Sequence, residues 1–263
     1  MKLKRTVARS AVILALLGAS GCFTVPRFEP LGALEERSAG VAACGNLRAA
    51  LVGEPPFRAL LNTTLDAPDG ESYSFRYAVV GNDSGDLRVD LLPNEGAFTL
   101  GLITIRGDQA LLIDSQRRVF SRGCGSEALF ERFFGLEGIN AGLIRALVTG
   151  VVPALNCQSV KVYRSSAGDL TLLDPVRHHA WRVSERSGEL LGVNLLDDKD
   201  SRIRVSAERV SLDGQRGIKI TVYKPAHAEA LMSVSRFNPK PNLTPELFEV
   251  SVPGDYQRES CEG

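Results

Sequence analysis

The three histidines are the first residues to consider for chemistry, because imidazole serves as a metal ligand and as a general acid or base. They are His178, His179 and His227. His178 and His179 lie at the start of an expected strand near Asp174, where two imidazoles and one carboxylate would make a metal site. Adjacent strand residues, however, point to opposite faces of a sheet. The sequence therefore predicts no metal site.

Two polar stretches have the residue types of other active centres but not their spacing. Residues 82–86 place Ser84 between two expected strands, and no G-x-S-x-G turn that would expose a serine nucleophile is present. Residues 197–200 lack the ligand spacing of a calcium loop. Both stretches are predicted to be turns. With no nucleophile–base pair, the sequence predicts a protein that is not an enzyme and needs no cofactor.

The N-terminus has the pattern of an export signal. Basic residues precede an apolar run from Ala11 to Leu17, and small residues then lead to Cys22. Ala19-Ser20-Gly21-Cys22 resembles a bacterial lipobox, which implies a signal peptide over residues 1–21 and an acylated Cys22 as lipid anchor. Phe23, rather than Asp, then implies the outer membrane. The alternative is an ordinary secretory signal followed by a cysteine that is not acylated.

Four cysteines follow the leader, namely Cys44, Cys124, Cys157 and Cys261. An even number in an exported protein favours two disulfides. Three pairings are possible, and we expect Cys124–Cys157 with Cys44–Cys261. Four free thiols or a metal site are the alternatives, although no Cys-x-x-Cys spacing supports zinc.

The net charge excludes some partners. The whole chain has 31 basic and 31 acidic residues, and the leader removes Lys2, Lys4, Arg5 and Arg9. The exported chain therefore keeps 27 basic residues and a formal charge of −4. No basic excess suggests a nucleic-acid partner.

The remaining chain is predicted to be mainly β, of the α+β class. Residues 22–30 read as a tether, and residues 31–263 as a single domain that begins with an amphipathic helix from Leu31 to Leu51. Helices are also expected over residues 126–134 and after Asn140. Period-two patterns predict strands at 73–79, 87–91, 99–106, 109–114, 117–121, 160–165, 169–173, 179–184, 189–196, 202–210, 217–223, 230–237 and 247–252.

Tight turns between these strands make sequential neighbours antiparallel. So many strands in one sheet must curl strongly. The helices would then cover the apolar concave face, where they either complete the core or leave a cavity for an apolar ligand. The residues alone leave both interpretations open.

Several segments resemble the LolA/LolB superfamily of lipoprotein-localisation factors. They are Ser74–Tyr77, Asp86–Gly96, Leu102–Gly107, Leu111–Asp114, Arg118–Phe120, Leu143–Pro153 and Leu247–Gly254. The resemblance implies an incomplete β-barrel whose helices form a lid over a hydrophobic cavity that takes acyl chains. Candidate cavity residues are Phe75, Tyr77, Val89, Leu91, Phe130, Phe133, Leu143 and Leu147.

The family's receptor also has a protruding loop with an exposed leucine. The matching loop here has Asn94 and Glu95 at its tip, so Leu92 or Phe98 would take the role of that leucine. The resemblance thus implies a monomeric outer-membrane lipoprotein that binds acyl chains of lipoproteins or lipids, with a periplasmic lipoprotein carrier as partner. The alternative is a non-catalytic structural or sensory interaction module of the cell envelope with the same fold.

Overall fold

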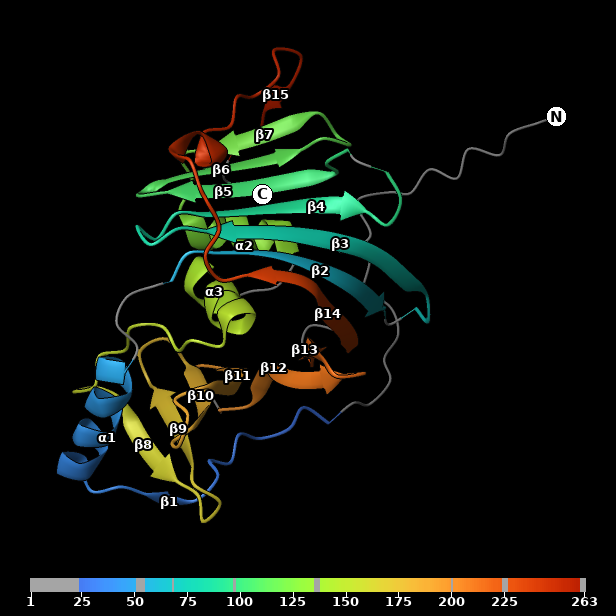
Figure 1. The fold of residues 1–263 in the computed structure, drawn as a ribbon. Coiled ribbons are helices and arrows are strands. Elements are labelled where there is room, and N and C mark those ends of the chain that lie inside the picture. The colour runs from blue at the N-terminus through green and yellow to red at the C-terminus, as the bar shows by residue number, and fades with distance from the viewer. Residues whose placement is uncertain are drawn as a thin grey trace.

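A computed structural model describes residues 24–50, 55–67, 69–96, 98–134, 138–199, 201–223 and 227–260. The described strands form one large, curved, unclosed sheet, and three helices pack on its concave face, as the sequence predicts (Figure 1). Every neighbouring pair is antiparallel except β15 with β7. The strand order is β1-β8-β9-β10-β11-β12-β13-β14-β2-β3-β4-β5-β6-β7-β15.

The order shows two consecutive meanders, β2–β7 and β8–β14, which join where β14 pairs with β2. The strands of the first are β2 (Phe57–Asp66), β3 (Ser72–Gly81), β4 (Leu87–Pro93), β5 (Gly101–Arg106), β6 (Gln109–Asp114) and β7 (Val119–Arg122). Those of the second are β8 (Lys161–Arg164), β9 (Asp169–Asp174), β10 (His179–Ser184), β11 (Leu190–Leu196), β12 (Ile203–Leu212), β13 (Gln215–Val222) and β14 (Ala228–Asn238). Two-residue strands, β1 (Ala33–Leu34) and β15 (Gln257–Arg258), lie at the edges.

Period-two alternation in the strands separates a concave inner face from a convex outer face. On β5, for example, Ile103 belongs to the main core with the helices, whereas Leu102 belongs to a second, smaller cluster. The main core draws on strands of both meanders and on all three helices, so the inner face is one continuous apolar surface.

Three helices cover different parts of that inner face. α1 (Arg37–Ala50) packs on β8, α2 (Ser126–Phe134) on β5 and β6, and α3 (Ala141–Thr149) on β11 and β12. Asn140 caps α3 as predicted, because its side chain accepts a hydrogen bond from the Leu143 amide at 3.0 Å. Gly150 ends the same helix with a φ of 81°, a conformation that favours glycine.

The two terminal segments cover the outer face. The C-terminal segment, with the short helix η2 (Pro245–Phe248), crosses in front of β4–β6 in Figure 1, while α2 lies behind them. Its apolar residues Val250, Val252 and Tyr256 pack on the outward side chains of β5–β7. The N-terminal segment instead crosses the second meander, where the Ile203 amide donates to the Pro26 carbonyl at 2.9 Å.

Three sequence expectations are corrected. The first helix begins at Arg37 rather than Leu31, because Ala33 and Leu34 pair with β8 as a strand. Residues 247–252 form no strand. Val250 and Val252 pack on the outer face of the sheet, and the backbone does not pair with an edge strand. Strand β2 is absent from the predicted elements, although the buried Phe57, Ala59 and Leu61 alternate with less buried residues in the pattern of a strand.

The expected cysteine pairing is wrong. Cys44 of α1 bonds to Cys157, which precedes β8, with a Cα–Cα distance of 5.6 Å. The prediction assigns Cys157 to Cys124 because it assumes a bridge across the α2–α3 insert, but α1 packs beside the start of the second meander. Cys124 is also disulfide-bonded, and Cys22 and Cys261 lie outside the described residues.

Candidate functional site

The inner face has one end where apolar side chains remain partly exposed, which we call the open end. It lies where β3 begins and β4 ends, between β14, β2 and the last turn of α2. The partly buried apolar residues that pack on the core there are Leu65, Phe75, Leu91, Phe133, Phe134, Ala230 and Met232. An apolar surface left partly open in this way is suited to an apolar ligand.

Aromatic rings from one strand and one helix meet at the open end. Phe75 and Tyr77 of β3 lie edge to face with centroids 5.2 Å apart, and Tyr77 is 5.5 Å from Phe134 of α2. Phe133 and Phe134 make a further edge-to-face pair at 4.9 Å. Burial raises the pKa of the Tyr77 hydroxyl well above its ordinary value, so this group stays neutral. The cluster therefore presents ring surfaces without charge.

The opposite end of the same strands is closed, and a buried arginine closes it. Arg145 of α3 donates to the carbonyls of Asn82 and Asp86, the latter at 3.1 Å, in the turn between β3 and β4. Its guanidinium lies 5.5 Å from the centroid of Phe57. A Cβ at Gly81 would collide with both groups, so this end has no room for a ligand.

The structure brings all eight predicted cavity residues into one apolar cluster, but in two environments. Phe75, Leu91 and Phe133 are partly exposed at the open end. The others are buried core residues, namely Tyr77, Val89, Phe130, Leu143 and Leu147. Leu65 and Met232 are not among the predicted cavity residues, although the strand alternation of β2 and β14 places them on the same face.

A buried hydroxyl lies beside the open end. Thr63 of β2 is 3% exposed, with Phe75 on one neighbouring strand and Met232 on the other. Its Oγ1 has no hydrogen-bond partner within the described part of the chain. A buried hydroxyl without a partner lowers the stability of the fold.

In strands β8–β13 of the second meander the inner face is sealed. His179 and Trp181 of β10 are buried with ring centroids 5.6 Å apart, and Trp181 belongs to the main core. Burial lowers the pKa of His179 to about 4, so its imidazole is neutral. His178 lies in the turn before β10, with a φ of 55°.

The predicted protruding loop follows the open end directly. Leu92 still belongs to β4 and is half-buried, whereas Phe98 is 61% exposed. Arg76 holds the loop through hydrogen bonds to the carbonyls of Pro93 at 3.1 Å and Gly96 at 3.0 Å. Of the two predicted apolar residues, only Phe98 points into solvent.

The predicted anchor Cys22 and signal peptide lie outside the described residues. Within the residues described, no helix is both long and apolar enough to cross a bilayer.

No protein-family model and no curated protein matches this sequence. Solved structures with a similar fold exist. An outer membrane lipoprotein-sorting protein domain from Vibrio parahaemolyticus matches with a TM-score of 0.55 and 11% identity, over 81% of this chain and 97% of that chain. A DUF1329 family protein from Desulfovibrio piger ATCC 29098 matches with a TM-score of 0.53 and 11% identity, over 80% and 96%. A LolA superfamily protein from Nitrosomonas europaea matches with a TM-score of 0.49 and 12% identity, over 81% and 97%. The first two show that the chain shares the fold of these two proteins.

Proposed function

We propose that this chain is a non-catalytic periplasmic lipoprotein, anchored in the outer membrane through Cys22, that binds acyl chains of lipoproteins or lipids at its open end and acts in lipoprotein localisation. The observation that carries the proposal is the open end itself, where Phe75, Leu91 and Phe133 stay partly exposed beside a packed core. The fold of a lipoprotein-sorting domain from Vibrio parahaemolyticus supports it.

Acyl-chain binding needs only apolar contact. Each methylene transferred from water to an apolar site contributes about 0.8 kcal/mol. The aromatic rings of Phe75, Phe133 and Phe134 supply such contact. The closed end, filled by Arg145 and Phe57, would stop the chain from threading through.

The N-terminal segment supports close anchoring. Phe28 donates its amide to the Ser201 carbonyl at 2.9 Å, so residues assigned to the tether are attached to the turn before β12. That turn and the open end lie at the same ends of the antiparallel strands. Pro26 is four residues after Cys22, a span of at most about 14 Å for an extended chain. An acylated Cys22 would therefore hold this end of the strands near the bilayer.

Phe98 is the residue we propose for contact with the bilayer during transfer. It is the exposed apolar side chain of the loop next to the open end, and Arg76 fixes that loop. In this proposal a periplasmic carrier delivers the cargo, and the chain passes it to the membrane.

The test uses two variants of neighbouring residues on opposite faces of β14. Met232 faces the open end, whereas Leu231 is exposed on the outer face. In the unacylated Cys22→Ser chain, Met232→Gln should weaken binding of a fluorescent acyl probe about tenfold, because a polar amide replaces apolar contact. Leu231→Gln is the matched control and should leave binding unchanged.

Absence of probe binding by the Cys22→Ser chain would contradict the proposal. So would equal affinities for the Met232→Gln and Leu231→Gln variants.

A further inference from the structure

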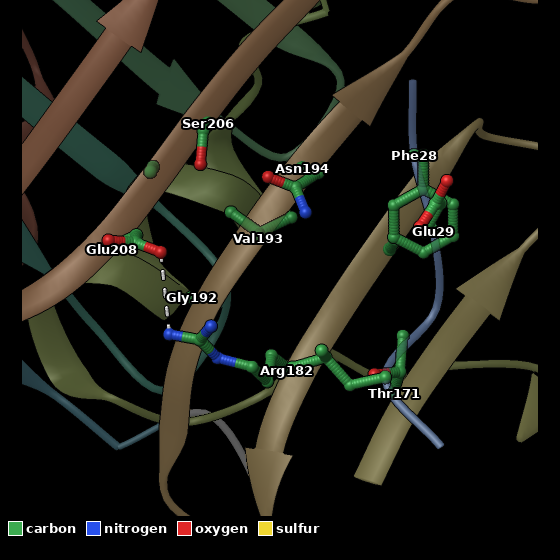
Figure 2. A pocket seen from close by; sticks show the side chains of 12 residues that line it. Phe28, Glu29, Thr171, Arg182, Gly192, Val193, Asn194, Ser206 and Glu208 are labelled. Carbon is green, nitrogen blue, oxygen red and sulfur yellow. Dashed lines mark ion pairs between the residues drawn. The ribbon is translucent and has the colours of Figure 1, made fainter. Parts of the chain in front are cut away.

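A polar pocket of ≈ 200 Å³ lies on the outer face of the sheet, opposite the apolar surface described above. Strands β9–β12 form its floor, and residues 28–31 of the N-terminal segment form one wall (Figure 2). Its side chains include Thr171, Arg182, Asn194, Ser206 and Glu208. The proposed acyl-binding function does not use any of these groups.

Backbone contacts, rather than side-chain conformations alone, define the shape of the pocket. The Ile203–Pro26 and Phe28–Ser201 backbone hydrogen bonds, both 2.9 Å, fix the segment that carries the Phe28 ring. On the floor, a Cβ at Gly192 would lie 2.8 Å from the Ala207 carbonyl oxygen, so the close strand contact leaves no room for a side chain at this position. Wall and floor are therefore both preformed.

Several polar side chains of the pocket are available to hydrogen-bond a ligand. Within the described residues, the Asn194 carboxamide and the Ser206 and Thr171 hydroxyls make no hydrogen bond to the protein. Arg182 contacts Glu208 at 3.5 Å, which leaves most of its five N–H donors unused.

The pocket has charges of both signs. Glu29 and Glu208 disfavour an anion, and Arg182 reduces their attraction for a cation. The groups that remain suit an uncharged ligand that carries both donors and acceptors and has an apolar flank for the Phe28 ring. The volume is below the about 300–1,000 Å³ typical of pockets for drug-sized ligands, so it admits one small ring.

We propose that this pocket binds one ring of an uncharged saccharide. The C–H face of the ring would lie against Phe28, and its hydroxyls would donate to Glu208 and accept from Arg182 and Asn194. This gives the chain a second ligand site on the face opposite the open end, independent of acyl binding.

The experiment is a titration of the Cys22→Ser chain with two uncharged saccharides, chitotriose and maltotriose, followed by backbone amide NMR. We expect at least one of them, at about 10 mM, to shift the amides of Gly192 and Asn194. Asn194→Ala should weaken this binding at least tenfold. Asn62→Ala, which removes the same group from an exposed position on β2, is the matched control and should bind like the parent chain.

Phe28→Ala is the second variant and should also weaken binding at least tenfold, with an unchanged melting temperature as the check on folding. No amide shift with either saccharide would overturn the proposal, as would equal binding by Asn194→Ala and Asn62→Ala. A shift of the same amides by an uncharged tripeptide alone would assign the pocket to peptides and overturn it as well. Acyl-probe binding is measured on the same samples, so failure here is distinct from failure of the proposed function.

Discussion

The two meanders of the sheet differ in which face is more completely covered. In the first meander the C-terminal segment covers the outer face of β5–β7, and the inner face is incompletely covered at the open end. In β8–β13 the inner face is sealed by α1 and α3, and the N-terminal segment leaves the polar pocket on the outer face. The open end and the polar pocket therefore lie on opposite faces of the same sheet.

Outward-facing side chains account for the difference on the outer face. β5 and β6 present Leu102, Leu111 and Ile113 outward, and the apolar C-terminal segment buries them. The corresponding positions of β10–β12 are polar, as Arg182, Asn194 and Ser206 show. Apolar side chains attract a covering segment that excludes water, whereas polar ones retain solvent or a ligand. The binding character of each face thus follows from which side chains alternate outward.

The largest expected effect concerns the seal on the inner face of the second meander. A double variant, Cys44→Ser with Cys157→Ser, removes a disulfide that joins residues 113 apart. The chain-entropy relation gives a loss of about 4–5 kcal/mol in the free energy of unfolding. Urea unfolding of the variant and the parent chain measures it.

The same variant tests whether the second meander can open inward. If α1 loosens from β8, a dye for exposed apolar surface should bind more strongly. The inner face of the second meander would then expose apolar side chains, as the open end does. A loss below about 1 kcal/mol would show that packing alone holds α1.

The next effect concerns the seal on the outer face of the first meander. Ile113→Ala should lower the free energy of unfolding by about 2–5 kcal/mol, because the side chain is buried beneath the C-terminal segment. Leu231→Ala, at an exposed position of the outer face, should change it by less than about 0.5 kcal/mol. Chemical denaturation compares the two variants. Equal losses in the free energy of unfolding would contradict burial of β6 beneath the C-terminal segment.

The fold is predictable from the sequence to a large extent, because strand alternation and turn residues are local signals. Asn140 and Gly150, for example, mark the two limits of α3 through their own side-chain and backbone preferences. The disulfide pairing and the course of residues 247–252 depend on contacts between distant segments, which no local pattern encodes. Leu34 shows the same limit, because its pairing with Tyr163 of β8 overrides its helical spacing with Val41 and Cys44.

The candidate site is predictable in part for the same reason. Phe75, Leu91 and Phe133 follow from apolar periodicity and from the family resemblance. Periodicity cannot tell which apolar residues end up buried, so Val89 and Leu143 are equal candidates although they lie in the packed core. The outer pocket has no signal in the sequence, since it depends on where the N-terminal segment crosses four strands.

The third effect is the pH dependence of the sealed inner face. His179 is 5% exposed, and burial lowers its pKa from 6.5 to about 4 despite the attraction of Asp174. Between these values the unfolded chain binds a proton that the folded chain does not, so stability falls as the pH drops below 6.5. The total loss is at most about 3 kcal/mol at pH 4 and below.

Urea unfolding between pH 7 and pH 4 measures this slope, and His179→Gln is the control that removes it. A parent and a variant with the same slope would show that other groups cause the acid sensitivity. The acyl-probe affinity of the open end should not follow the slope, because the rings that we assign to it carry no charge that titrates in this range.

The smallest effect compares two hydroxyls that both face outward. Thr104 of β5 is buried and donates from Oγ1 to the Phe248 carbonyl at 3.3 Å, whereas Ser206 of β12 faces the pocket without a protein partner in the described chain. Thr104→Val should cost about 1 kcal/mol, because the carbonyl of the covering segment loses its donor. Ser206→Ala should change stability by less than about 0.5 kcal/mol, because no protein bond is broken. Thermal unfolding of the two variants decides between them: a larger loss for Ser206→Ala would mean that its hydroxyl supports the fold rather than facing a ligand.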